Sequence, residues 1–167
     1  MDSIVQIAQI LGPIAVAVGV IFAVIQIRMI ERQRGEQAAV VIVHSFQSAE
    51  FNKAIRLLWS VPPETTAQEL RSAPKEVEEA AVFISTTLET IGVLVHRRVV
   101  PISLVDDLMG DAIVNLWPRL KDWVETLRRE QSRESVAEWF QWLVDRLSER
   151  ERRKTVGAHA RYATWKS

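Results

Sequence analysis

The sequence contains no cysteine, which excludes disulfides, a thiolate nucleophile and any zinc or iron–sulfur site built on cysteine. It also lacks an excess of either charge, because 21 Lys and Arg balance 21 Asp and Glu. The overall charge therefore favours neither nucleic acid nor an acidic partner. What is present is a 167-residue chain, 48% hydrophobic, which is enough for one domain with a compact core.

Charged residues are missing from Ser3 to Ile27, a run that would form a helix about 37 Å long. A hydrocarbon core is roughly 30 Å thick, so this run can cross it. A cleaved secretory signal is disfavoured, because the preceding "MDS" carries an acid and no Lys or Arg. A core helix of this length would normally show a polar face. We predict a retained transmembrane helix within residues 1–30 and a helical domain over residues 31–167.

The orientation of this span is predicted from its flanks. Arg28, Arg32 and Arg34 follow the uncharged run, whereas Asp2 precedes it. The positive-inside rule places the arginine side in the cytoplasm. We therefore expect a protein of the cell inner membrane, with its N-terminus outside and the domain in the cytoplasm.

Small and amide side chains recur along one face of the predicted span. Their spacing of 3, 4, 3, 4 and 3 residues forms a single stripe, the seam, which consists of Gln9, Gly12, Val16, Gly19, Ala23 and Gln26. Helices associate in lipid through close packing over small residues and through interhelical hydrogen bonds. The seam thus predicts that the span packs against itself or against subunits of a larger membrane complex. A plain lipid anchor is the simpler interpretation, because Gly and Ala are common in such helices.

The remainder of the chain predicts an all-α fold with about five helices and no strand, because apolar residues recur at helical spacing throughout. The central helix is expected from Pro74 to His96. Ser103 with Asp106, and Ser135 with Glu138, resemble capping boxes that would start two further helices. Pro118 should either divide or kink the helix that contains it.

Residues with catalytic potential are few. The histidines are dispersed and fit no metal-ligand spacing; they are His44, His96 and His159. Asp107 and Asp111 share a helix face, as paired acids that bind a metal or transfer protons can do. The simpler interpretation is that Asp106 caps a helix and Asp107 is solvated near its start. We predict no catalytic residue, no metal and no cofactor.

Three further residue types suggest packing rather than chemistry. Glu89 interrupts an apolar helix and should be paired, with an Arg from the last helices as the expected partner. Gly110 should permit close helix packing. Trp139 and Trp142 lie on one helix face, where core packing explains them best and a partner surface is the second interpretation.

The segments "LETIGVLVHRRVVPISLVDDLMGDAIVNLWPRL" and "EWFQWLVDRL" resemble an uncharacterised bacterial family of short, membrane-anchored helical proteins, a domain of unknown function. The matching positions cover an acid in an apolar helix, a following glycine, a second glycine and a tryptophan; they are Glu89, Ile91, Gly92, Leu94, Gly110 and Trp117. The resemblance extends over about half the chain. It implies one N-terminal span with a helical cytoplasmic domain and brings no established activity.

Together these features predict a non-enzymatic single-pass membrane protein whose cytoplasmic module makes protein contacts. Its expected partners are membrane lipid and either itself or subunits of a larger complex, and not nucleic acid. The alternative is a small homo-oligomeric channel or membrane effector, in which Gln9 and Gln26 line a pore.

Overall fold

The structure, a computed structural model, describes residues 19–27, 29, 37, 40–154, 156–161 and 163–165. Within these residues the regular structure is entirely helical, which confirms the predicted all-α class. The chain divides into two compact units, Met1–Ala38 and Ala39–Ser167. We call the second unit the module and treat each unit separately.

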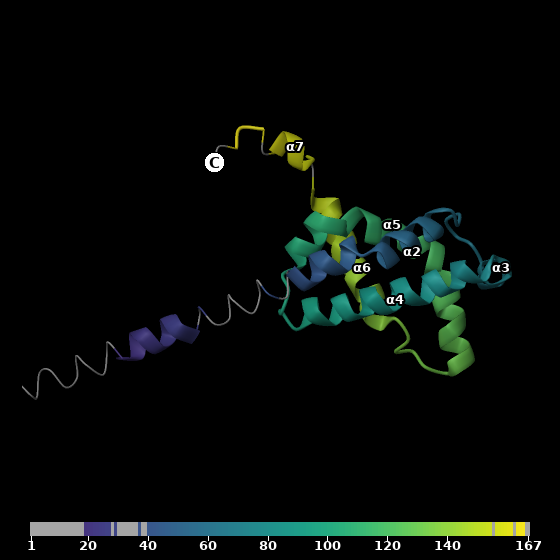
Figure 1. The fold of residues 1–167 in the computed structure, drawn as a ribbon, viewed down its shortest axis with the longest axis horizontal. Helices are drawn as coiled ribbons and strands as arrows, with labels where there is room; N and C mark the ends of the chain where they lie inside the picture. Colours follow the sequence, from purple (N-terminus) through teal and green to yellow (C-terminus); the bar gives the residue numbers. More distant parts are fainter. Residues whose placement is uncertain are drawn as a thin grey trace, which may run out of the picture. The chain divides into compact units, whose positions relative to one another are not determined.

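The module consists of helices joined by short turns (Figure 1). Residues 40–47 are helical, and the elements that follow are α2 (Ala49–Trp59), α3 (Ala67–Ser72), α4 (Lys75–His96), α5 (Ile102–Gln131), α6 (Glu138–Arg153) and α7 (Ala158–Arg161). The "VVIVH" segment, which in isolation could pass for a strand, is helical as its flanks indicate.

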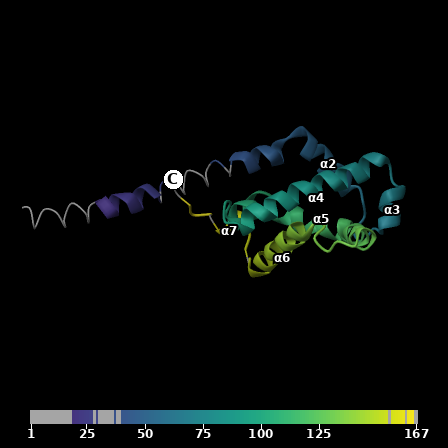
Figure 2. The ribbon, with the colours of Figure 1, turned by 90° about the horizontal axis from the view of Figure 1, so that it is seen from below.

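Helix α4 is the central element, as predicted, and begins directly after Pro74. It packs against α2 and α6, and Figure 2 shows it between these two helices. Ala81, Ile84 and Leu88 of α4 are completely buried. Their spacing of three and four residues keeps them on one face of the helix, which explains why this face forms the core.

Helix α5 runs without interruption through Pro118, so the proline does not divide it. A proline inside a helix removes one backbone donor and locally opens the helix. The Pro118 carbonyl accepts a hydrogen bond from the Glu64 N–H at 2.9 Å. The loop before α3 is thereby fastened to the middle of α5.

Both predicted capping boxes in this part of the chain are wrong. Helix α5 begins after Pro101, without a side-chain cap, and Ser103 lies inside its first turn. Helix α6 begins after Ala137, whose backbone is left-handed with a φ of 52°. The capping box that does form was not predicted: Thr66 and Glu69 bond reciprocally at the start of α3.

Arg128 braces the turn between α5 and α6. Its guanidinium donates to the carbonyl oxygens of Val136 and Ala137 and to the side-chain oxygen of Gln141. These bonds hold the left-handed residue that precedes α6, because a non-glycine residue in this backbone region needs such support.

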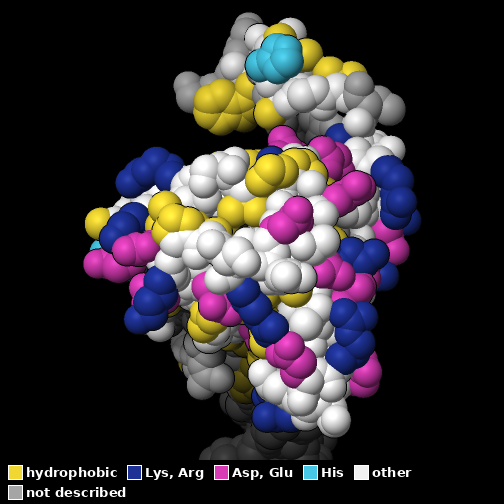
Figure 3. Space-filling view, turned by 90° about the vertical axis from the view of Figure 1, so that its right-hand side faces the viewer, with side chains coloured by type: hydrophobic (Ala, Val, Ile, Leu, Met, Phe, Trp, Pro, Cys, Tyr) yellow, Lys and Arg dark blue, Asp and Glu magenta, His cyan; other side chains and the backbone are white. Residues whose placement is uncertain are grey.

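Charges of both signs are interspersed over the end of the module that carries α3 (Figure 3). Among the described residues, one helix is long and apolar enough to cross a membrane, and this helix is α4. It has 22 residues, and its most apolar window has a mean hydropathy of 1.2 and is 44% buried within the protein.

Candidate functional site

Asp106 is the buried acid of the module, and its side chain is only 2% exposed. It lies in the second turn of α5 and points at the C-terminal end of α6. The Arg150 Nε donates to one carboxylate oxygen at 3.1 Å, and the Lys154 Nζ to the other at 2.6 Å. The predicted capping role is therefore wrong, because Asp106 pairs with two cations from another helix.

Gly110 makes this arrangement possible. A Cβ atom at position 110 would lie 2.5 Å from the Asp106 Oδ1, one turn earlier in the same helix. Any other residue would push the carboxylate out of its place. We predicted that Gly110 permits close helix packing, but the atoms that a Cβ would meet all belong to Asp106.

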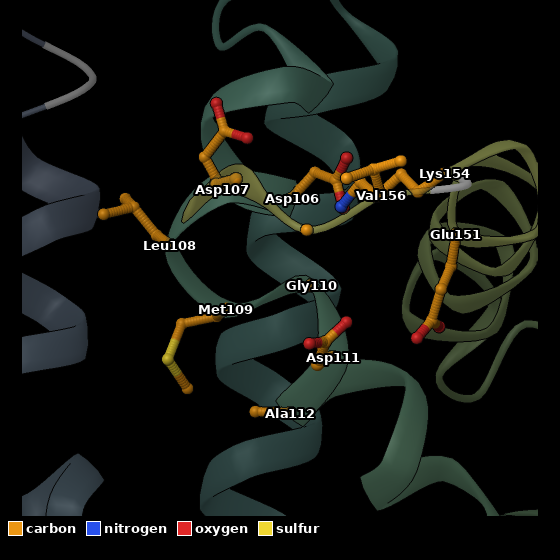
Figure 4. A pocket seen from close by; sticks show the side chains of 12 residues that line it. Asp106, Asp107, Leu108, Met109, Gly110, Asp111, Ala112, Glu151, Lys154 and Val156 are labelled. Atoms are coloured by element: carbon orange, nitrogen blue, oxygen red, sulfur yellow. The ribbon is translucent and has the colours of Figure 1, made fainter. Parts of the chain in front are cut away.

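A pocket of about 560 Å³ opens beside this ion pair (Figure 4). It is lined by the start of α5, where Asp107 and Asp111 both contribute, and by residues at and after the end of α6; these are Glu151, Lys154, Val156, Gly157 and Ala158. Among the described residues that line it, the polar side chains are those of Asp106, Asp107, Asp111, Glu151 and Lys154. These described residues offer carboxylates and one paired ammonium group.

The other flagged acid, Glu89, lies at the opposite end of α6. Its Oε2 accepts a hydrogen bond at 2.8 Å from the backbone N–H of Phe140, in the first turn of that helix. This partner is a backbone group rather than the expected Arg side chain. A carboxylate suits a helix N-terminus, where N–H groups lack partners and the helix dipole is positive.

Gly92 lets α6 approach α4 beside Glu89. A Cβ atom at position 92 would overlap the carbonyl group of Trp139. The absence of a side chain at Gly92 therefore allows the backbone of α4 to approach the main chain of Trp139 closely. Glu89 and Gly92 lie one helical turn apart and serve the same junction.

Aromatic rings cover this junction. The His96 ring lies 4.5 Å from the Trp139 ring and 5.6 Å from the Trp142 ring, between centroids. Trp117 packs edge-on against the buried Phe140 at 5.2 Å. Both α6 tryptophans are half-buried, so packing within the module accounts for most of their surface.

The remaining histidines, His44 and His159, are exposed. Among the described residues, no group of three or more His, Asp and Glu side chains could hold a metal ion.

The predicted seam is described only in part. Gly19, Ala23 and Gln26 belong to the helical stretch 19–27, in which every residue is exposed. The other seam positions, Gln9, Gly12 and Val16, lie outside the described residues, as do the flanking arginines Arg28, Arg32 and Arg34.

The sequence identified Glu89, Asp106 and Gly110 as unusual residues but did not reveal that they serve one helix. Glu89 holds the N-terminal end of α6 and Asp106 holds the C-terminal end, where Gly110 leaves room for the Asp106 carboxylate. The sequence did contain a signal for the contact at the C-terminal end of α6. Arg150 and Lys154 are spaced four residues apart and so share a helix face. Nothing in the sequence identifies which acid these cations meet.

Comparison with protein families matches most of the chain to a known family. A family described as "Domain of unknown function (DUF4760)" covers residues 13–147, which is most of the chain. This range includes both acids and both glycines of the α6 contacts. Neither the curated proteins nor the solved structures provide a match. The chain therefore belongs to the DUF4760 family, as the resemblance to an uncharacterised domain family predicted.

Proposed function

We propose that the protein is a non-enzymatic single-pass membrane protein, anchored by its N-terminal helix, whose module makes protein contacts in the cytoplasm. The observation that carries this proposal is the exposed apolar helix at residues 19–27. Its large apolar side chains are 45–60% exposed; they are Val20, Ile21, Phe22, Val24, Ile25 and Ile27. A continuous apolar surface of this kind is typical of contact with lipid or with another protein.

The length of the uncharged run favours lipid over a soluble partner. From Ser3 to Ile27 the run would be about 37 Å long as a helix, against roughly 30 Å for a hydrocarbon core. A binding helix for a soluble partner would need a polar face toward water, and this run has none.

Helix α4 is the rival span, but its environment supports a core role. Nine of its residues are buried within the module, and Glu89 in its second half bonds to α6. Pulling α4 into lipid would expose the rest of the core and break this bond. Residues 31–167 are therefore proposed to remain together on the cytoplasmic side.

The proposal of a non-enzymatic role is supported by the Asp106 pocket. Its most buried acid is already neutralised by Arg150 and Lys154. Each of its two oxygens accepts a charge-assisted hydrogen bond, so this carboxylate is engaged in holding α6 rather than left open to the pocket.

Membrane extraction and topology reporters test the anchor. The full chain is expected to stay in the membrane pellet at high pH and to be released only by detergent. A reporter placed after Ser167 should behave as cytoplasmic, and one placed before Asp2 as external. Release at high pH would contradict the anchor, and the reverse reporter pattern would contradict the orientation.

Substitution in the seam tests whether the anchor also packs. Gly19→Leu should remove most of the oligomeric fraction seen in mild detergent, because a bulky side chain holds helices apart. Among the described residues, no atom outside the surrounding helix backbone lies within 4 Å of a Cβ placed at Gly19, so an added side chain begins in open space there. Ile21→Leu, off the seam, is the matched control and should change little. An unchanged oligomer in Gly19→Leu would reduce the span to a lipid anchor.

A further inference from the structure

The turn after α4 presents an exposed apolar side chain beside two cations. Val99, at its tip, is 39% exposed. Arg97 and Arg98 precede it and are exposed as well. In the described part of the chain, neither arginine has an ion-pair or side-chain hydrogen-bond partner. These two charges are therefore free to meet something outside the module.

The backbone holds this turn in a defined shape. The Val99 N–H donates to the Leu94 carbonyl oxygen, and the Arg98 N–H to that of Val95, both at 3.0 Å. This is the Schellman pattern that ends many helices, in which glycine usually occupies the left-handed position. Here that position is Arg98, with a φ of 57°. The turn thus carries this cation at some cost in stability, because a side chain is disfavoured in that backbone region.

The turn lies at the end of the module where the chain enters. Residues 40–47 pack beside the second half of α4, and a groove between them includes Val41 and Leu94. Figures 1 and 2 both show the start of residues 40–47, the turn after α4 and the start of α5 at one end of the module. The end of α6 joins them through the ion pairs of Asp106. We call this the entry end; it comprises residues 40–41, 96–107 and 150–154.

The entry end has an excess of positive charge. Residues 96–107 and 150–154 contain six Lys and Arg against three Asp and Glu. Asp106 is already neutralised by Arg150 and Lys154. The remaining cations are exposed and have no ion-pair partner among the described residues, and they outnumber the remaining acids; they are Arg97, Arg98, Arg152 and Arg153, against Asp107 and Glu151.

The opposite end of the module, which carries α3, has the reverse balance. This α3 end, residues 64–79 and 119–138, contains seven Lys and Arg against ten Asp and Glu. Several of its cations are paired within the module; the pairs are Arg71–Glu130, Lys75–Glu79 and Lys121–Glu125. An anionic surface would therefore attract the entry end and repel the α3 end.

We propose that the entry end docks on the anionic lipid surface of the membrane that holds the N-terminal helix, with Val99 in the headgroup region. This inference rests on the proposed anchor, which brings lipid to this end. Residues 28–39 alone join the uncharged run to the module, so the entry end stays within roughly 40 Å of the bilayer even if this link is fully extended. An apolar side chain among arginines suits this surface, because the apolar group enters the interface while the cations attract anionic lipid.

Environment-sensitive fluorescence in the full chain tests the docking, since the natural sequence has no cysteine and a single introduced one can be labelled. Val99→Cys carrying an NBD fluorophore is placed in phosphatidylcholine vesicles that contain about one-third phosphatidylglycerol. Lipids with a nitroxide at the top of the acyl chain should quench its emission about twofold, because the label lies at their depth. In vesicles of phosphatidylcholine alone, most of this quenching should be lost.

The control is Ser72→Cys with the same label, exposed in the last turn of α3 and therefore at the α3 end. It should show no quenching in either kind of vesicle. Flotation of the vesicles separates the two ways of failing. A chain that does not float with them would contradict the anchor and the docking together. A chain that floats while its Val99 label is quenched no more than the Ser72 label would overturn the docking alone.

A charge variant tests the arginines. Arg98→Gly, added to the labelled Val99→Cys chain, removes one cation and suits the left-handed position, so the turn should keep its shape. At the lipid composition that gives half-maximal quenching without it, the ratio of docked to undocked chain should fall about fivefold. Arg133→Gln, exposed at the α3 end, removes the same charge and should leave this ratio unchanged. An unchanged ratio in Arg98→Gly, or an equal fall in both variants, would overturn the proposal.

Discussion

The two ends of α6 are both held by carboxylates, yet by opposite means. At the N-terminal end Glu89 accepts directly from a backbone N–H, that of Phe140. At the C-terminal end Asp106 meets two side chains, those of Arg150 and Lys154. A helix offers free N–H groups only at its start and free carbonyl groups at its end. An acid can therefore bind the first end directly but needs cationic side chains at the second.

The two contacts also differ in burial. The Asp106 side chain is 2% exposed, whereas its partners Arg150 and Lys154 are 42% and 33% exposed. Glu89 is half-buried. In the C-terminal contact the acid cannot reach water, whereas both cations can. The loss of stability on breaking the contact therefore depends on whether the acid or the cations are removed.

The largest expected effect comes from removing both cations. Arg150→Ala with Lys154→Ala should lower the free energy of unfolding by about 3 kcal/mol, because the buried Asp106 charge is left unpaired. Asp106→Ala should cost less, about 1–2 kcal/mol, because the freed cations can be solvated. Urea unfolding followed by circular dichroism measures both.

The matched control for the double variant is Arg152→Ala with Arg153→Ala, which removes the same charge from the same turn of α6. Both residues are exposed and neither lines the pocket. The free energy of unfolding should therefore fall by only about 0.5 kcal/mol, from the lost interaction with the helix dipole. Equal losses in the two double variants would show that net charge, and not the buried carboxylate, decides stability at this end.

The acids that hold α6 could be flagged from the sequence, but their partners could not. Glu89 stands out because an acid in an apolar helix must be paired. Its partner is a backbone N–H, which every residue carries, so no sequence pattern distinguishes Phe140 from its neighbours. The same holds for Gly92, whose close contact is with the main chain of Trp139.

Capping patterns show the same limit. Near the start of a helix, Ser or Thr is followed three residues later by an acid at Ser103, at Ser135 and at Thr66. Only the Thr66 pattern caps a helix. At the other two places a tertiary contact replaces the cap. Asp106 pairs with Arg150 of α6 instead of capping α5. Arg128 binds the carbonyl of Val136 and so fixes the turn that precedes α6. The long helix α4, in contrast, was predicted nearly residue for residue, since its apolar periodicity is local.

A smaller effect is expected at the N-terminal end of α6. Glu89→Gln keeps an acceptor for the Phe140 N–H but removes the charge, and should lower the free energy of unfolding by about 0.5–1 kcal/mol. Glu89→Ala removes both and should cost about 1–2 kcal/mol, like the loss of a helix cap. Thr90→Ala, exposed on the same helix, is the control and should stay within about 0.5 kcal/mol. If Glu89→Gln cost as much as Glu89→Ala, the charge rather than the hydrogen bond would hold this end.

The smallest effect is expected at α3, which is held by an exposed carboxylate and so contrasts with α6. Helix α3 is fastened to α5 by a two-pronged ion pair, in which Arg71 donates to both oxygens of Glu130 at 2.6–2.7 Å. The hydrogen bonds from Arg71 hold the pKa of Glu130 below its usual 4.5, and those from the backbone and hydroxyl of Thr66 do the same for the pKa of Glu69.

A carboxyl group whose pKa is lowered by folding stabilises the fold above its usual pKa, and the stabilisation is lost as the pH falls through the lowered value. We therefore expect α3 to loosen slightly as the pH falls below 4.5, with amide exchange in residues 67–72 rising faster than a pH-corrected reference. Glu130→Gln should show the looser α3 already at neutral pH and a weaker change on acidification. If Glu130→Gln and the natural chain showed the same protection of α3 at neutral pH and the same change on acidification, the ion pair would contribute nothing, as happens for many exposed pairs. Burial of the carboxylate would then explain why the Asp106 contact stabilises α6 whereas the Glu130 contact does not stabilise α3.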